Sequence, residues 1–90
     1  MITVHLPPDL AVEFDIAPTF RLRAGSLEEM VDRLDQEAPG IRGWLSESDG
    51  RFRQHLSIFV DGRRLAPRSR AEQPLSDNIE VWILRAISGG

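Results

Sequence analysis

The chain has 90 residues, a formal net charge of −3 and no cysteine. This length suits one small domain, and the lack of cysteine excludes disulfides, thiolate metal sites and thiol nucleophiles. The negative charge argues against electrostatic capture of nucleic acid or of an anionic membrane. All 11 basic residues are arginine, so the sequence offers no side-chain amine for Schiff-base chemistry.

The first residues have the pattern of a half-buried strand. Apolar and polar side chains alternate along residues 2–6, which is the two-residue period of a strand. The proline pair at 7–8 ends it, because proline cannot donate to a sheet ladder. A basic leader and a long apolar run are both missing, so we expect no signal peptide, no membrane span and a cytoplasmic location.

Residues 10–18 carry a mixed signal. Apolar residues alternate along the segment, yet Pro8 and Pro18 bracket it. We therefore expect a loop with some strand or single-turn character. Residues 19–23 alternate more clearly and predict a second strand, with its apolar residues directed inward and both arginines outward.

The main predicted helix covers about residues 26–38. Ser26 and Glu29 have the spacing of a capping box, in which each side chain satisfies a backbone N–H at the helix start. Four apolar residues then recur at the spacing of one helical stripe, namely Leu27, Met30, Val31 and Leu34. Pro39-Gly40 ends the helix. We interpret the stripe as core and the acidic opposite face as solvated surface.

The second half of the chain predicts three further strands. Residues 41–45 are expected to form a short turn that places Trp44 and Leu45 on the core, and residues 46–53 a polar loop. A strand follows at residues 55–60 and is turned by Asp61-Gly62, a strong hairpin signal. A short return strand at 63–65, a loop to residue 76 and a final alternating strand complete the domain.

This order of elements predicts an α+β domain, with a mixed four- to five-stranded sheet packed on the one main helix. The first and last strands are expected to pair in parallel, because the helix crosses over between them. The chain ends in Ser88-Gly89-Gly90. We divide it into a domain, 1–87, and a flexible C-terminal tail, 88–90. A frayed end or a cloning remnant is the alternative interpretation of the glycines.

Together these features resemble the ubiquitin-like β-grasp proteins. The narrower resemblance is to the bacterial sulfur carriers: the small subunit of molybdopterin synthase, the thiamin-pathway carrier and the cysteine-pathway carrier. The residues that carry it span the chain: Ile2-Thr3-Val4, Ser26-Leu27-Glu28-Glu29, Pro39-Gly40-Ile41, Ile58-Phe59-Val60-Asp61-Gly62, Pro74-Leu75-Ser76-Asp77 and Gly89-Gly90. Arg85-Ala86 departs from the molybdopterin branch, which often has prolines there. The pathway therefore stays open.

The resemblance implies a function for the tail. An ATP-dependent, ubiquitin-activating-like enzyme would adenylate the Gly90 carboxylate, and a sulfur donor would convert it to a thiocarboxylate. A sulfur-accepting synthase subunit or enzyme would then use that sulfur for a molybdopterin-like cofactor or for cysteine. The chain would bind no cofactor or metal, since ATP and the sulfur donor belong to the partner. It would be a carrier or a small non-catalytic subunit rather than an enzyme.

Recognition needs a surface outside the tail, because small residues carry little binding information. If alternate residues of the final strand face the helix, Phe59, Trp82 and Leu84 point into solvent on neighbouring strands. Exposed apolar and aromatic clusters of this kind mark protein interfaces, and the resemblance implies that the partner docks there. The alternative is a second small core beneath the 63–76 loop. We expect Arg85 and Ile87 to line the entrance of the partner's channel; a solvated arginine is the alternative.

Three other functions are weighed against the carrier. An autonomous enzyme is disfavoured, because His5 and His55 show neither a nucleophile-elbow nor a metal-ligand spacing and occupy outward strand positions. A non-covalent β-grasp interaction module with an inert tail would use the same apolar surface. A ubiquitin-like protein modifier would use the same activated tail, with a lysine of another protein as acceptor.

Overall fold

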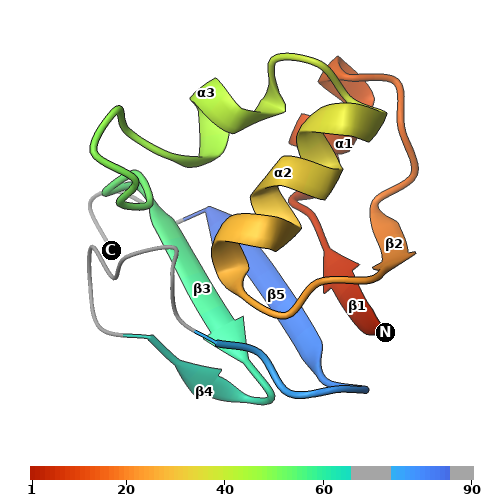
Figure 1. The fold of residues 1–90 in the computed structure, drawn as a ribbon. Coiled ribbons are helices and arrows are strands. Elements are labelled where there is room, and N and C mark those ends of the chain that lie inside the picture. The colour runs from red at the N-terminus through yellow and green to blue at the C-terminus, as the bar shows by residue number, and fades with distance from the viewer. Residues whose placement is uncertain (66–73, 86–90) are drawn as a thin grey trace.

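The computed structural model describes residues 1–65 and 74–85 (Figure 1). Its elements are β1 (Ile2–His5), α1 (Pro8–Glu13), β2 (Thr19–Leu22), α2 (Leu27–Glu37), α3 (Ile41–Leu45), β3 (Leu56–Val60), β4 (Arg63–Arg64) and β5 (Glu80–Arg85). The strands form one sheet in the order β2-β1-β5-β3-β4. Among the strands of the described residues, only β1 and β5 pair in parallel. The predicted α+β class and the parallel pairing of the first and last strands are confirmed.

The core lies between α2 and one face of the sheet (Figure 1). The helix buries its whole predicted stripe, Leu27, Met30, Val31 and Leu34. From the sheet, Val4, Val81 and Ile83 meet it with no more than a trace of exposure. Burial of each such side chain is worth about 1.5–3 kcal/mol. β1, β5 and α2 therefore share several of the most deeply buried side chains of the described residues.

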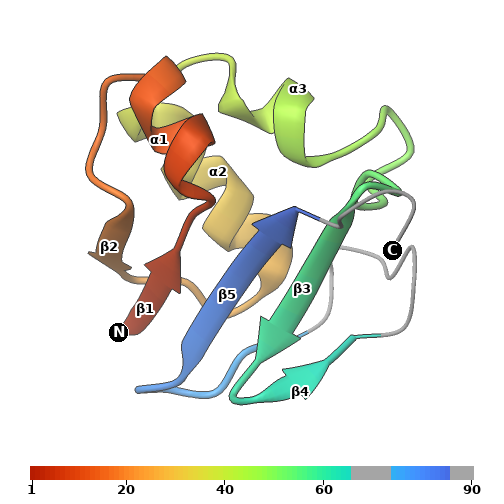
Figure 2. The same cartoon turned by 180° about the vertical axis from the view of Figure 1, so that it is seen from behind.

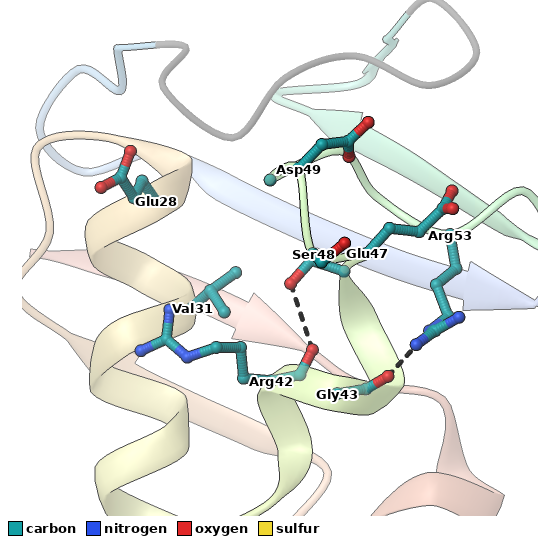
Figure 3. A pocket seen from close by; sticks show the side chains of 10 residues that line it. Glu28, Val31, Arg42, Gly43, Glu47, Ser48, Asp49 and Arg53 are labelled. Carbon is teal, nitrogen blue, oxygen red and sulfur yellow. Dashed lines mark hydrogen bonds between the residues drawn. The ribbon is translucent and has the colours of Figure 1, made fainter.

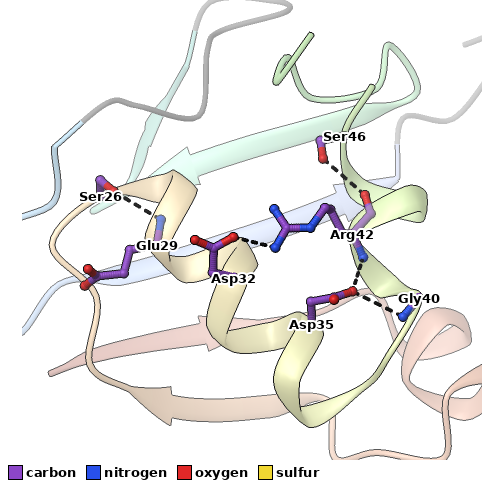
Figure 4. Close-up of polar contacts among 7 residues, drawn as sticks. All are labelled: Ser26, Glu29, Asp32, Asp35, Gly40, Arg42 and Ser46. Atoms are coloured by element: carbon purple, nitrogen blue, oxygen red, sulfur yellow. Dashed lines mark hydrogen bonds and ion pairs between the residues drawn. The ribbon is translucent and has the colours of Figure 1, made fainter. Parts of the chain in front are cut away.

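The start of α2 is fixed by its cap (Figure 4). The Glu29 N–H donates to Ser26 Oγ at 3.1 Å, as the predicted capping box requires. The return bond differs, because Glu29 Oε1 accepts from the N–H of Gly25 at 2.9 Å rather than from that of Ser26. The first bond satisfies a donor that the helix start leaves open, and the second fixes the residue that precedes the cap.

One carboxylate holds the turn between α2 and α3. Asp35 Oδ1 accepts from the N–H of Gly40 at 3.2 Å and of Arg42 at 3.1 Å (Figure 4). Gly40 has a φ of 101°, a left-handed conformation that glycine adopts without strain. Residues 41–45, predicted to be a turn, form a short helix. This helix buries Leu45 and leaves Trp44 half-buried against the core.

Two segments differ from the sequence prediction. Residues 8–13 form a helix rather than a loop, because Pro8 takes the first helical position, where its missing N–H removes no bond. Leu10 and Ala11 hold this helix on the core. The 46–53 segment is not simply a polar loop, since Phe52 is 2% exposed and its backbone pairs with Ser46.

Candidate functional site

The face of the sheet turned away from α2 carries the predicted docking residues. No helix of the described part covers this face (Figure 2). Phe59 pairs with Trp82 across β3 and β5, and Leu84 pairs with Ser57 on the same two strands. Trp82 is 43% exposed and Leu84 40% exposed, whereas Phe59 is half-buried. Phe59, Trp82 and Leu84 thus form one apolar patch, which we call the docking face.

His5 borders the docking face and supports it. Its ring stacks on that of Trp82, with centroids 3.7 Å apart and planes 12° apart. Its Nε2 lies 2.6 Å from Glu80 Oε1, and its Nδ1 lies 3.4 Å from Thr19 Oγ1. From the sequence, His5 was expected only to occupy an outward position of a strand. The stack arises from the register of β1 against β5, where His5 stands opposite Trp82.

The same cluster has the order of hydroxyl, imidazole and carboxylate that a hydrolytic triad uses. The separation of 3.4 Å between Thr19 Oγ1 and the ring is at the long limit of hydrogen bonding. The ring of His5 also lies flat on that of Trp82. We therefore assign the cluster to support of Trp82.

Replacing His5 by alanine is expected to lower the free energy of unfolding by about 1 kcal/mol, because it removes a stacked ring and a side-chain hydrogen bond. Urea unfolding measures this loss. The fluorescence emission of Trp82 should also move to the red, recorded with Trp44→Phe so that one tryptophan remains. The matched control is His55→Ala, since His55 is exposed and outside any strand. If His55→Ala lowered the free energy of unfolding as much as His5→Ala does, the assignment of His5 to the support of Trp82 would be contradicted.

Arg85 lies on the other side of β5 from Trp82 and Leu84. It pairs with Leu56 at the end of the strand, and its guanidinium forms an ion pair with Asp9 of α1. The same guanidinium lies 5.6 Å from the ring centroid of Trp44 on α3. The structure therefore separates Arg85 from the docking face. The other predicted site residues, Ile87, Ser88, Gly89 and Gly90, lie outside the described residues.

A hollow of about 540 Å³ opens between α2 and the segment that follows α3 (Figure 3). Two arginines of its lining are engaged by the protein itself. Arg42 pairs with Asp32 at 2.5 Å, and Arg53 Nε donates to the carbonyl of Gly43 at 2.7 Å. No cluster of metal-ligating residues occurs in residues 1–65 and 74–85. We assign no ligand to this hollow.

The N-terminus is tied to the loop that leads into β5. The ammonium group of Met1 forms an ion pair with Asp77. The hydrogen bond from this ammonium, and then its charge, lower the pKa of Asp77 below its ordinary value. Asp77 lies before β5, and we assign it no role in the docking face. Within the described ranges, no helix is long and apolar enough to cross a membrane.

No protein-family model and no curated protein matches the chain, but solved structures do. A chain in the crystal structure of the Amycolatopsis orientalis BexX/CysO complex superposes with a TM-score of 0.85 at 19% identity, covering 100% of both chains. Mycobacterium tuberculosis CysO gives a TM-score of 0.84 at 20% identity, over 97% of this chain and 100% of its own.

SAMP1 from Haloferax volcanii gives a TM-score of 0.74 at 20% identity, over 99% of this chain and 98% of its own. A second SAMP1, from Methanosarcina acetivorans, gives a TM-score of 0.74 at 19% identity, over 99% of this chain and 95% of its own. Because the likeness covers nearly the whole chain, the ubiquitin-like β-grasp fold predicted from the sequence is confirmed.

Proposed function

We propose that this β-grasp chain is a sulfur carrier. An ATP-dependent, ubiquitin-activating-like enzyme joins the Gly90 carboxylate to AMP and releases pyrophosphate. Sulfide then attacks the carbonyl carbon and displaces AMP, which leaves a thiocarboxylate. A persulfide donor would displace AMP to give an acyl disulfide, and a thiol of the partner would then cleave the S–S bond, forming a disulfide and releasing the thiocarboxylate. A carboxylate at neutral pH is a poor electrophile, and the mixed anhydride with AMP supplies the missing leaving group. A second enzyme uses the sulfur in molybdopterin-like cofactor or cysteine biosynthesis.

The docking face next to the root of the tail is the observation that carries this proposal. Trp82 and Leu84 lie on β5, which ends at Arg85, and five residues, 86–90, follow. Five residues span at most about 17 Å. A partner that grips the docking face therefore holds the terminal carboxylate within that distance of the end of β5. The chain supplies the handle, and the partner supplies ATP and the sulfur donor.

The names of the similar structures are consistent with a protein that modifies other proteins or acts together with them. BexX/CysO is a complex of two proteins, and SAMP1 is a small archaeal modifier protein. The second name favours one alternative, in which the activated Gly90 is joined to a lysine of another protein. The carrier and the modifier share the adenylation step and differ in the nucleophile that follows.

Intact-mass analysis separates these functions. The chain is incubated with a ubiquitin-activating-like enzyme, ATP and a sulfide donor, and a parallel sample omits ATP. We expect a gain that matches exchange of one oxygen for sulfur, placed at Gly90 by fragmentation and absent without ATP. An adduct to a lysine of another protein would instead establish the modifier. Unchanged mass with retained binding to the enzyme would leave a non-covalent module and overturn the carrier.

A further inference from the structure

We infer that Arg85 is a positioning residue that clamps the root of the tail between two helices. The inference rests on the proposed function, since it concerns how Gly90 is delivered to the activating enzyme. Arg85 is the last residue of β5. Whatever holds its backbone and side chain sets the direction in which residues 86–90 leave the domain.

Two contacts hold the side chain of Arg85. Its guanidinium forms an ion pair with Asp9, in the first turn of α1. It also lies 5.6 Å from the ring centroid of Trp44, within the range of a cation–π contact. Leu84 and Arg85 are consecutive residues of β5, so their side chains lie on opposite faces of the sheet. We call Asp9, Trp44 and Arg85 the root clamp.

Each partner in the root clamp is itself positioned by the fold. Asp9 follows Pro8, whose ring presets the first turn of α1. Trp44 is placed by α3, whose start is bonded to the Asp35 carboxylate. The backbone of Arg85 is paired with Leu56 of β3. An arginine held in this way at the end of a strand opposes fraying, which is the usual state of a strand terminus.

The consequence for activation follows from geometry. Reacting atoms must come within about 3–3.5 Å, and a misplacement of about 1 Å can lower a rate by about 100-fold. If the clamp opens, Arg85 alone is released from the end of β5, and Gly90 can reach a larger volume. Docking through Phe59, Trp82 and Leu84 is untouched by this change. Loss of the clamp should therefore lower kcat for adenylation and leave KM unchanged.

Trypsin tests the clamp without any partner. Trypsin cleaves after arginine and must take the arginine side chain into its own pocket, so Arg85 has to leave Asp9 before the bond to Ala86 is cut. We expect Asp9→Asn to speed this cleavage about fivefold, because it removes one ion pair between partly exposed groups, which is of modest strength. Cleavage after Arg33, within α2, reports opening of the whole domain and should not change.

The matched control is Glu13→Gln, which removes an exposed carboxylate from the same helix. Asp9→Glu keeps the charge and should retain most of the protection. Trypsin rates that are equal in wild type, Asp9→Asn and Glu13→Gln would overturn the clamp. Faster cleavage after both Arg33 and Arg85 in Asp9→Asn would also overturn it, because the effect would then be general destabilisation.

The link to activation is tested by ATP–pyrophosphate exchange with an adenylating enzyme that converts the wild-type chain. We expect Asp9→Asn and Trp44→Leu each to lower kcat about 3- to 10-fold with KM unchanged, and Asp9→Glu to restore it. An unchanged kcat in a variant with faster trypsin cleavage would overturn the positioning role. If no such enzyme converts even the wild-type chain, the proposed function fails, while the trypsin comparison still decides the clamp.

Discussion

Adding one alanine after Gly90 is expected to lower thiocarboxylate formation at least 100-fold, without changing the fold or the affinity for the activating enzyme. The added residue moves the terminal carboxylate by about 3.5 Å, whereas a displacement of about 1 Å already costs about two orders of magnitude in rate. It also ends the chain in a side chain that carries a Cβ. Intact mass and pyrophosphate exchange measure the loss.

Ser88→Ala is the control for this extension, because it alters the tail without changing the length of the chain. It alters the tail by one hydroxyl, keeps the Gly-Gly carboxylate in place, and should be converted at nearly the wild-type rate. Conversion of the extended chain as fast as this control would show that the position of the carboxylate does not matter. The carrier mechanism would then be wrong as written.

Leu84→Glu is expected to weaken binding to the activating enzyme at least about 30-fold, the effect of losing an interface hot spot. Leu84 is 40% exposed on the docking face, so a glutamate there can remain hydrated in the free chain. In the complex, the same carboxylate would be buried against an apolar contact without a partner. Phe59→Glu should act in the same direction. Titration calorimetry measures the Kd, and thermal unfolding checks the fold.

Val12→Glu is the control that separates a specific surface from general apolarity. Val12 is 80% exposed and lies on α1, away from the docking face. This substitution also replaces an exposed apolar residue with a charge, yet it should leave the Kd within about twofold of the wild-type value, as expected for a residue outside the interface. Equal weakening by Leu84→Glu and Val12→Glu, or equal turnover of Leu84→Glu and wild type, would contradict the docking face.

Local rules were sufficient for much of the fold. Asp61 and Gly62 both adopt positive φ, 51° and 84°, as the aspartate–glycine hairpin signal requires. Ser26 caps α2 where the sequence placed the helix start. Alternation along β5 separated the buried Val81 and Ile83 from the exposed Trp82 and Leu84. These features depend on neighbouring residues, so the sequence carries them directly.

Other features depend on residues that are distant in the chain. Arg85 and Asp9 are 76 positions apart, and only the sheet topology and the seating of α1 bring them together. The stack of His5 on Trp82 likewise needs the parallel register of β1 and β5. The helix α1 was missed for a different reason, because Pro8 was interpreted as a breaker although proline is favourable at a helix start.

The parallel pairing at the centre of the sheet also governs when this protein can fold. Val4 on β1 stands opposite Val81 on β5, so the middle of the sheet stays incomplete until the ribosome has made residue 85. Until then the nascent chain exposes an unpaired edge of β1, which is a hazard for misassembly. In the folded chain the two edge strands of the sheet are β2, which carries an exposed arginine, and β4, which has two residues.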